Sequence, residues 1–318
     1  YKGTHGTKIQ NYTSDPANSL TGQVWYNETT QTLKVNAGAL VGAWSTGNNM
    51  NQARENLGSA GTQTAALGFG GYATGATTVN TELWNGTNWT EVNNLNTARN
   101  ALAGAGTSTA ALAFGGIPYS SGFTELWNGT NWTEVNDLGT ARYYLGGAGT
   151  STAALAFGGR VGSIYALTET WNGTNWTEVN DLNTARPKLA GTGATNTEAL
   201  AFGGDNGGGV VKANTELWNG TNWTEVNDLN TARSELGGAG IQTAALAFGG
   251  YSAPTVTANT ETWNGTNWTE VNNLNAARNK LAGAGTNTAA LAFGGQPVST
   301  LFSEEWSFSG GISTIDTD

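Results

Sequence analysis

One arginine and one glutamate recur in equivalent copies along the chain, and they are its most regular chemically active groups. The arginines are Arg54, Arg99, Arg142, Arg186, Arg233 and Arg278, and the glutamates are Glu82, Glu125, Glu169, Glu216, Glu261 and Glu304. Paired carboxylates can cleave glycosidic bonds, but an active site needs one distinctive arrangement, and here the same pair occurs six times. We therefore expect a structural role, as Arg–Glu pairs or arginine–backbone bonds that hold neighbouring units together.

Other residues that catalyse reactions or bind metals are scarce. His5 is the one histidine, and there is no cysteine. Metal sites usually combine several His, Cys, Asp or Glu ligands, and a Ser-His-Asp site would need His5, which is far from the repeated residues. We therefore predict no catalytic residue, no metal, no cofactor and no enzymatic activity.

The composition of the chain limits its partners. The 318 residues carry a formal net charge of −10 with only 13 Lys and Arg, so the basic surface that nucleic-acid binding requires is not expected. There is no apolar run near the ~18 residues of a membrane-spanning segment, so we expect no membrane insertion. Because the sequence begins at Tyr1, we interpret it as processed or truncated.

An internal repeat organises most of the sequence. The segment TELWNGTNWTEVN at 81–93 has close copies beginning at 124, 168, 215 and 260, and FGG occurs six times. The repeated arginines are separated by 45, 43, 44, 47 and 45 residues. Six copies at this period suit units of four short strands, which is the size of a β-propeller blade. We predict an all-β fold, a six-bladed β-propeller over 41–308.

One unit can be divided into strands at 101–106, 110–115, 124–128 and 132–136, with Asn-Gly predicting a tight turn between the last two. Side chains alternate across a strand, so the apolar strand 110–115 has bulky residues on one face and alanines on the other. Facing blades can then interlock large residues against small ones. Residues 43–48 match a fourth strand without the preceding three, which 281–285, 289–294 and 302–307 supply. Such closure removes exposed sheet edges.

The Gly-Gly doublet after an apolar strand, followed by an aromatic residue and then Trp, resembles the repeats of kelch propellers over about 41–308. Trp84 and its equivalents stand where kelch repeats usually carry Tyr. The resemblance implies the propeller fold and does not imply a function, because propellers have many activities.

Residues 1–40 do not repeat. Gln23–Asn27 and Thr32–Val35 alternate in polarity and predict a β-hairpin. The pattern GQVWYNETTQTLKV is similar to a short module of bacteriophage tail fibres and related virion proteins. This resemblance implies an extracellular position on the virion surface, with 1–40 as a connector to other virion proteins, and a homotrimer is one assembly it implies. Alternatively, this segment only packs on the propeller rim. Residues 309–318 are assigned as a C-terminal tail.

Two sets of variable positions stand out against the near-identical repeats. They are the loop that follows each FGG and the two residues that follow each repeated arginine, and a propeller brings both sets to one face. We predict that this face binds a ligand through Tyr72, Tyr119, Tyr143, Tyr144, Arg160, Tyr165, Lys188, Asp205, Lys212, Glu235, Tyr251 and Lys280. Exposed tyrosines with polar neighbours suit carbohydrate, because the ring packs on a sugar and polar groups bond to its hydroxyls.

These features support three functional hypotheses. The first is a virion receptor-binding protein that recognises a host cell-surface glycan. The second is a structural decoration of a capsid or tail that binds no ligand. A polysaccharide-degrading enzyme is the third, and it is disfavoured because the carboxylates are repeated in every unit.

Overall fold

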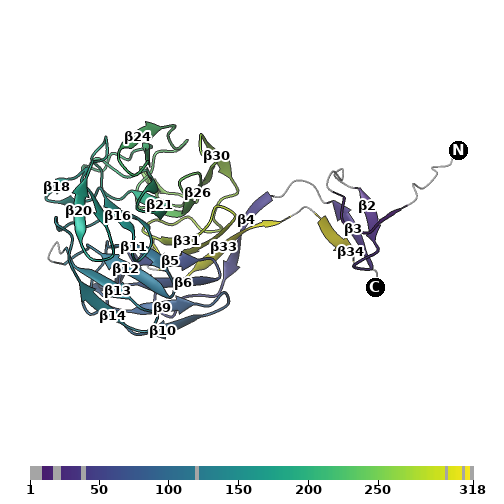
Figure 1. Ribbon diagram of the computed structural model, residues 1–318, viewed down its shortest axis with the longest axis horizontal. Coiled ribbons are helices and arrows are strands. Elements are labelled where there is room, and N and C mark those ends of the chain that lie inside the picture. The colour runs from purple at the N-terminus through teal and green to yellow at the C-terminus, as the bar shows by residue number, and fades with distance from the viewer. Residues whose placement is uncertain are drawn as a thin grey trace. The chain divides into compact units, whose positions relative to one another are not determined.

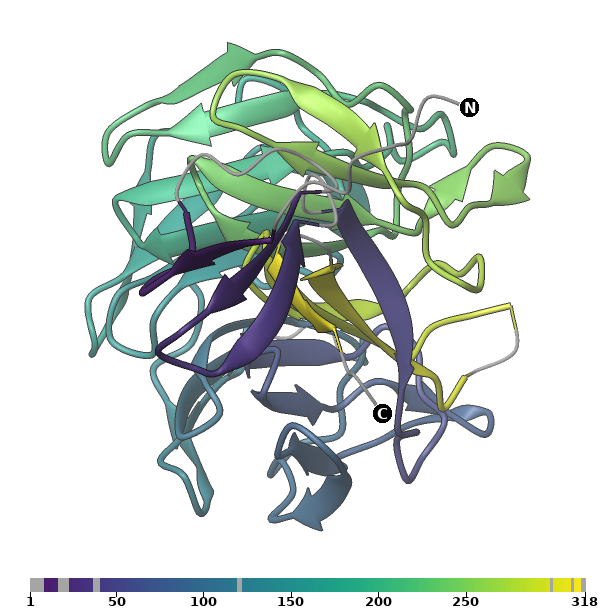
Figure 2. The same ribbon diagram turned by 90° about the vertical axis from the view of Figure 1, so that its right-hand side faces the viewer.

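The computed structural model describes residues 9–16, 23–36, 41–118, 122–297, 300–309 and 312–315. These residues form strands, turns and loops (Figures 1 and 2), and none of them belongs to a helix long and apolar enough to cross a membrane. The chain divides into two compact units, one of Tyr1–Ala43 with Phe308–Asp318 and one of Trp44–Ser307. The second unit contains the repeated segments of the sequence.

The larger unit is built from antiparallel four-stranded sheets, which we call the repeat sheets, and the described residues contain six of them. In order from innermost to outermost strand they are β5 (Gly58–Thr62), β6 (Ala65–Phe69), β9 (Thr81–Trp84) and β10 (Trp89–Val92); β11 (Ala103–Thr107), β12 (Ala110–Phe114), β13 (Thr124–Trp127) and β14 (Trp132–Val135); β15 (Gly146–Gly149), β16 (Ala154–Phe157), β19 (Thr168–Trp171) and β20 (Trp176–Val179); β21 (Ala190–Thr195), β22 (Glu198–Phe202), β23 (Thr215–Trp218) and β24 (Trp223–Val226); β25 (Gly237–Ile241), β26 (Ala244–Phe248), β29 (Thr260–Trp263) and β30 (Trp268–Val271); and β31 (Ala282–Gly285), β32 (Ala289–Phe293), β33 (Ser303–Ser309) and β4 (Val41–Gly47). An all-β chain of repeated four-stranded sheets is consistent with a β-propeller.

Some loops carry a short two-stranded hairpin after the second strand of a repeat sheet. These hairpins are β7 (Tyr72–Ala73) with β8 (Ala76–Thr77), β17 (Arg160–Val161) with β18 (Ser163–Ile164), and β27 (Tyr251–Ser252) with β28 (Thr255–Val256). They lie in the segments whose sequence differs most between repeats.

The predicted strands agree with the structure to within two residues at each end. The predicted tight turn between β13 and β14 is present. It consists of the four residues 128–131, since Trp127 pairs with Trp132. Asn128 Oδ1 accepts hydrogen bonds from the backbone N–H groups of Thr130 and Asn131, which closes the turn.

Neighbouring repeat sheets pack large side chains against small ones, as the alternation predicted. Leu67 and Phe69 share a buried cluster with Ala111 and Ala113 of the next sheet. The Phe69 ring also meets Trp132, with ring centroids 5.0 Å apart and planes inclined by 63°. Edge-to-face pairs of this kind add roughly 0.5–1.5 kcal/mol to the burial of their area. The core therefore lies between the sheets.

Both ends of the repeat region contribute to one sheet. The strands of this sheet follow in the order β31, β32, β33 and β4, so β4 lies next to β33. In Figure 1, the purple ribbon of β4 and the yellow ribbon of β33 lie side by side. The pairing of a strand near residue 44 with strands beyond residue 280 follows the prediction from the two incomplete repeats. Trp44 then contacts Phe248 and Trp306, with ring centroids 4.9 and 5.5 Å away.

The smaller unit is a four-stranded sheet in the order β1 (Gln10–Tyr12), β2 (Val24–Asn27), β3 (Thr32–Asn36) and β34 (Ile312–Ile315). β1 pairs with β2 in parallel, and the other pairs are antiparallel. The predicted hairpin is confirmed as β2 and β3. The segment 309–318, assigned above as a tail, contributes β34, which lies alongside β3 in Figure 1.

Candidate functional site

The second residue after each repeated arginine has an unusual backbone conformation. These residues are Asn56, Ala101, Tyr144, Lys188, Glu235 and Lys280, and their φ angles lie between 52° and 59°. This left-handed region is unfavourable for residues with a side chain. It also explains why β11 begins at Ala103 and not at the predicted Ala101. A strained conformation kept at six equivalent positions indicates a shared structural constraint.

The constraint is a cycle of backbone hydrogen bonds, which we call the backbone ring. Ala101 N donates to Asn56 O, Tyr144 N to Ala101 O, Lys188 N to Tyr144 O, Glu235 N to Lys188 O, Lys280 N to Glu235 O, and Asn56 N to Lys280 O, over 2.7–2.9 Å. Each ring residue therefore both donates and accepts. Positive φ aligns the N–H of each residue with the carbonyl of the previous one, so the ring compensates for the strain.

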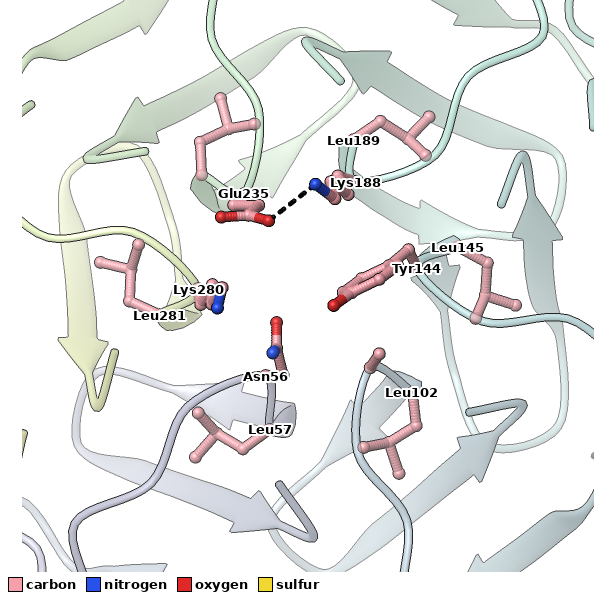
Figure 3. A pocket seen from close by; sticks show the side chains of 12 residues that line it. Asn56, Leu57, Leu102, Tyr144, Leu145, Lys188, Leu189, Glu235, Lys280 and Leu281 are labelled. Carbon is pink, nitrogen blue, oxygen red and sulfur yellow. Dashed lines mark ion pairs between the residues drawn. The ribbon is translucent and has the colours of Figure 1, made fainter. Parts of the chain in front are cut away.

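The backbone ring surrounds a small cavity of about 100 Å³, which we call the ring pocket. The side chains of the ring residues line it together with the leucine that follows each of them. In Figure 3, the Tyr144 hydroxyl and the Asn56 amide point toward its centre. A drug-sized ligand needs a cavity of roughly 300–1,000 Å³, so this pocket has room for a substituent and not for a whole sugar ring.

Opposite charges meet on one side of the ring pocket. Lys188 Nζ lies 3.0 Å from Glu235 Oε1 and 3.3 Å from Asp205 Oδ2, and 5.5 Å from the centre of the Tyr144 ring. Burial acts to lower the pKa of Lys188, but the charges of Glu235 and Asp205 outweigh it and raise this pKa. For Tyr144, burial has the opposite effect and raises the pKa, because it disfavours the charged phenolate. Lys188 therefore stays protonated and Tyr144 stays neutral at neutral pH.

Two buried residues outside the pocket bond to side chains that line it. Lys280 Nζ lies 3.3 Å from Glu55 Oε1, and Asn279 Nδ2 donates to Glu235 Oε2 over 2.6 Å. Only 5% of Glu55 and 6% of Asn279 is exposed. Glu55, Asn56 and Asn279 were absent from the predicted binding residues, although they occupy the same variable positions as Tyr143, Tyr144 and Lys280. Their equivalence in the repeat was the signal that could have identified them.

The structure brings several of the other predicted binding residues to the ring pocket or close to it. Tyr143 packs on Tyr144 with ring centroids 5.3 Å apart. The first loop residues Tyr72, Arg160 and Tyr251 pair through their backbone with Glu55, Tyr143 and Ser234. Tyr165 and Lys212 accept hydrogen bonds from the backbone N–H groups of Arg186 and Arg233. Tyr119 lies outside the described residues.

The repeated arginines and glutamates form buried ion pairs, which join Arg54 to Glu82, Arg99 to Glu125, Arg142 to Glu169, Arg186 to Glu216, Arg233 to Glu261 and Arg278 to Glu304. Arg99 Nη2 lies 2.9 Å from Glu125 Oε1, and Arg99 Nη1 donates to the Gly115 and Phe123 carbonyl oxygens. Glu125 also accepts from the Asn96 backbone N–H over 2.7 Å.

These clusters connect successive repeat sheets. Asn96 and Arg99 lie in the segment that leaves β10, whereas Glu125 lies on β13 of the next sheet. Burial lowers the pKa of Arg99, and the charge on Glu125 opposes this effect. Both partners of this pair are buried and hydrogen-bonded within the protein.

A larger, apolar cavity of about 540 Å³ lies beside the loop that precedes β33. Its lining includes Ala276, Ala277, Pro297 and Phe302, and 47% of Phe302 is exposed. Ala276 replaces the threonine found after the Asn in most other repeats, which makes this part of the surface more apolar.

Neither protein-family models nor curated proteins give a match to this chain. Among the described residues, no group of three or more His, Cys, Asp or Glu is arranged to hold a metal ion.

Proposed function

We propose that the repeat sheets are the six blades of a closed, kelch-like β-propeller. Three observations support this proposal. The inner strands neighbour one another in the order β5, β11, β15, β21, β25 and β31, and β31 also neighbours β5. The backbone ring runs through all six repeats and returns to its start. β4 and β33, from opposite ends of the repeat region, lie in one sheet.

We further propose that the chain is a virion surface protein that binds a host cell-surface glycan. The observation that carries this proposal is that the variable side chains meet around the ring pocket on an otherwise uniform scaffold. Tyr143, Tyr144, Lys188, Glu235 and Asp205 are connected there by ring contacts and ion pairs. Tyrosine rings beside fixed polar groups are the usual surroundings of a bound sugar.

The dimensions of the site suggest how a glycan would lie. The ring pocket of about 100 Å³ accommodates one substituent, so the sugar ring itself would lie outside it, against Tyr143 and Tyr144. The charged side chains around the pocket would then select which substituent enters. Residues 1–40 would connect the propeller to other virion proteins, and a homotrimer is the assembly that we propose for this connection.

The test is binding of the purified chain to an array of bacterial surface glycans, with Tyr143→Ala/Tyr144→Ala measured in parallel. Tyr12→Ala, which removes a tyrosine on β1 in the smaller unit, is the matched control. We expect the chain and the control to bind the same glycans and the double variant to lose them.

Two results would contradict this proposal. If the correctly folded chain binds no glycan, structural decoration of a capsid or tail becomes the better hypothesis. Release of new reducing ends from a polysaccharide, lost in Glu125→Gln, would instead show an enzyme and would assign the repeated glutamates a catalytic role.

A further inference from the structure

Two polar side chains that line the ring pocket are free to bind a ligand. The Tyr144 hydroxyl and the Asn56 amide point toward the centre of the pocket in Figure 3. Neither group forms a hydrogen bond within the part of the chain that the structure describes, and both residues are half-buried. A ligand that covers such groups removes their water, so it must supply hydrogen-bond partners of its own.

Both of these groups are neutral, and each can donate and accept a hydrogen bond. Burial raises the pKa of Tyr144, so its hydroxyl keeps its proton at neutral pH. An asparagine amide has donors on its nitrogen and an acceptor in its oxygen. In the backbone ring, Asn56 and Tyr144 lie on either side of Ala101, whose side chain is a single methyl group. The ring therefore has no larger side chain between its two free polar groups.

The charged side chains that line the pocket are already paired. Lys188 Nζ lies 3.0 Å from Glu235 Oε1, and Lys280 Nζ lies 3.3 Å from Glu55 Oε1. A charged substituent would lose its water on entering the pocket and would have to compete with one of these partners for its counter-charge. The groups that remain for a ligand are therefore the neutral ones, and they require a neutral substituent that both donates and accepts.

We propose that the ring pocket binds the exocyclic hydroxymethyl group of a neutral hexose in the recognised glycan. This inference rests on the proposed glycan binding and names the chemical class of the sugar. A hydroxyl group has one O–H donor and two acceptor lone pairs. It can therefore donate to one of the two free groups, Tyr144 or Asn56, and accept from the other. The sugar ring stays outside the pocket, against Tyr143 and Tyr144.

The volume of the pocket agrees with this ligand. Water occupies about 30 Å³ per molecule in the liquid, so a cavity of about 100 Å³ has room for a hydroxyl group with the carbon that carries it. A pentose has no exocyclic carbon and would leave both free groups without a partner. A uronic acid has a carboxylate in the same place, which brings a charge that the paired side chains of the pocket do not compensate.

The experiment is calorimetric titration of the chain with two matched pairs of tetrasaccharides at the same ionic strength. Cellotetraose and xylotetraose have the same linkage, and only the first carries hydroxymethyl groups. Mannotetraose and the mannuronate tetramer also share a linkage, and the second has carboxylates in place of the hydroxymethyl groups. We expect the chain to bind at least one of the two hexose tetramers, and to bind its matched partner at least about tenfold more weakly, because two hydrogen bonds are lost or a charge is left uncompensated.

Two variants test the free groups themselves. Tyr144→Phe removes the hydroxyl and keeps the ring, and Asn56→Ala removes the amide at a ring position where Ala101 already has the same backbone conformation. Each should weaken binding of the hexose tetramer roughly two- to tenfold and leave binding of the tetramer without hydroxymethyl groups unchanged. Tyr143→Phe is the matched control, because Tyr143 does not line the pocket, and it should change neither.

The possible results separate this inference from the proposed function. Equal binding within both pairs, or variants that weaken both members of a pair equally, would contradict the hydroxymethyl site. If neither hexose tetramer binds but other glycans do, and Tyr143→Ala/Tyr144→Ala loses them, the proposed function stands and this inference is overturned. Absence of binding to any glycan would contradict both.

Discussion

The backbone N–H of Asn56 donates a hydrogen bond to the carbonyl oxygen of Lys280 over 2.9 Å, although more than 200 residues separate them in the chain. This bond is the member of the backbone ring that joins the first repeat to the last. Because the other five bonds connect successive repeats, it completes the cycle. The ring also fixes the left-handed conformation of six residues whose side chains line the pocket.

Ala101→Gly should stabilise the protein, because glycine adopts a positive φ without the strain that alanine has at 54°. The greater entropy of glycine in the unfolded chain offsets part of this gain, so we expect an increase of about 0.5–1 kcal/mol in the free energy of unfolding. Chemical denaturation measures it. The matched control is Ala103→Gly on β11, which should lower stability by about as much. A loss of stability in Ala101→Gly would show that the left-handed conformation is not strained.

Gly104→Ala should destabilise the protein, because its Cβ would lie 2.3 Å from the Ser59 carbonyl oxygen and 2.6 Å from the Phe69 ring. Overpacking of this kind costs about 1–3 kcal/mol. The equivalent position in the first repeat is Ser59, whose hydroxyl donates to the Gly283 carbonyl over 2.8 Å. Ser59→Ala should therefore cost only that hydrogen bond, about 0.5–1.5 kcal/mol. Urea denaturation of both variants tests this difference, and equal losses would contradict it.

Arg99→Met should lower the free energy of unfolding by about 3–5 kcal/mol, because the Glu125 carboxylate would remain buried without its cation. The Gly115 and Phe123 carbonyls would lose their donor as well. Lys212→Met, in a loop, is the control and should change stability by no more than about 0.5 kcal/mol. The measurement is guanidinium denaturation. A small effect of Arg99→Met would show that the ion pair is not needed to hold successive sheets together.

Protonation of Asp15 in acid should destabilise the smaller unit. Hydrogen bonds from Asn27 and from the Trp25 indole lower the pKa of Asp15 below its ordinary value of 3.8. A carboxyl group with a lowered pKa in the folded state contributes stability above its unfolded pKa, and this stability is lost as the pH falls through the folded pKa. The Trp25 indole N–H resonance in NMR should therefore shift as the pH falls below 3.8.

Asp15→Asn is the control for this titration. Its amide oxygen can still accept both hydrogen bonds but has no proton to gain in this range. The Trp25 signal of this variant should not change over the same interval. A Trp25 shift of equal size in both proteins would assign the acid transition to another group.

The repeat allowed the strand content and the Arg–Glu pairs to be predicted, because each feature depends on residues that recur at a fixed period. The pairing of β4 with the last repeat followed from counting residues in two incomplete copies. The role of β34 could not be found in this way. The segment Ile312–Ile315 does not recur elsewhere in the chain. Four residues are also too few for their side-chain pattern to predict that this strand pairs with β3.

The candidate site was predicted as a face and not as a pocket. The variable positions identified four residues that line the pocket, Tyr144, Lys188, Glu235 and Lys280. Asn56 was missed, because asparagine is common in this chain and does not by itself indicate a binding site. Nor does any local pattern show that these residues have a positive φ. That conformation is favourable only when the carbonyl of the previous repeat is in place to accept the N–H.

The sequence by itself determined the local elements of this protein. Alternating apolar residues, Asn-Gly turns and a repeat of 43–47 residues act over distances of one unit, so they can be recognised without a fold. The tertiary structure decided the backbone ring and the ion pairs that Lys188 and Lys280 form beside its pocket. These features exist only when residues from different repeats approach within hydrogen-bonding distance, because hydrogen bonds and ion pairs depend on position in space and not on order in the chain.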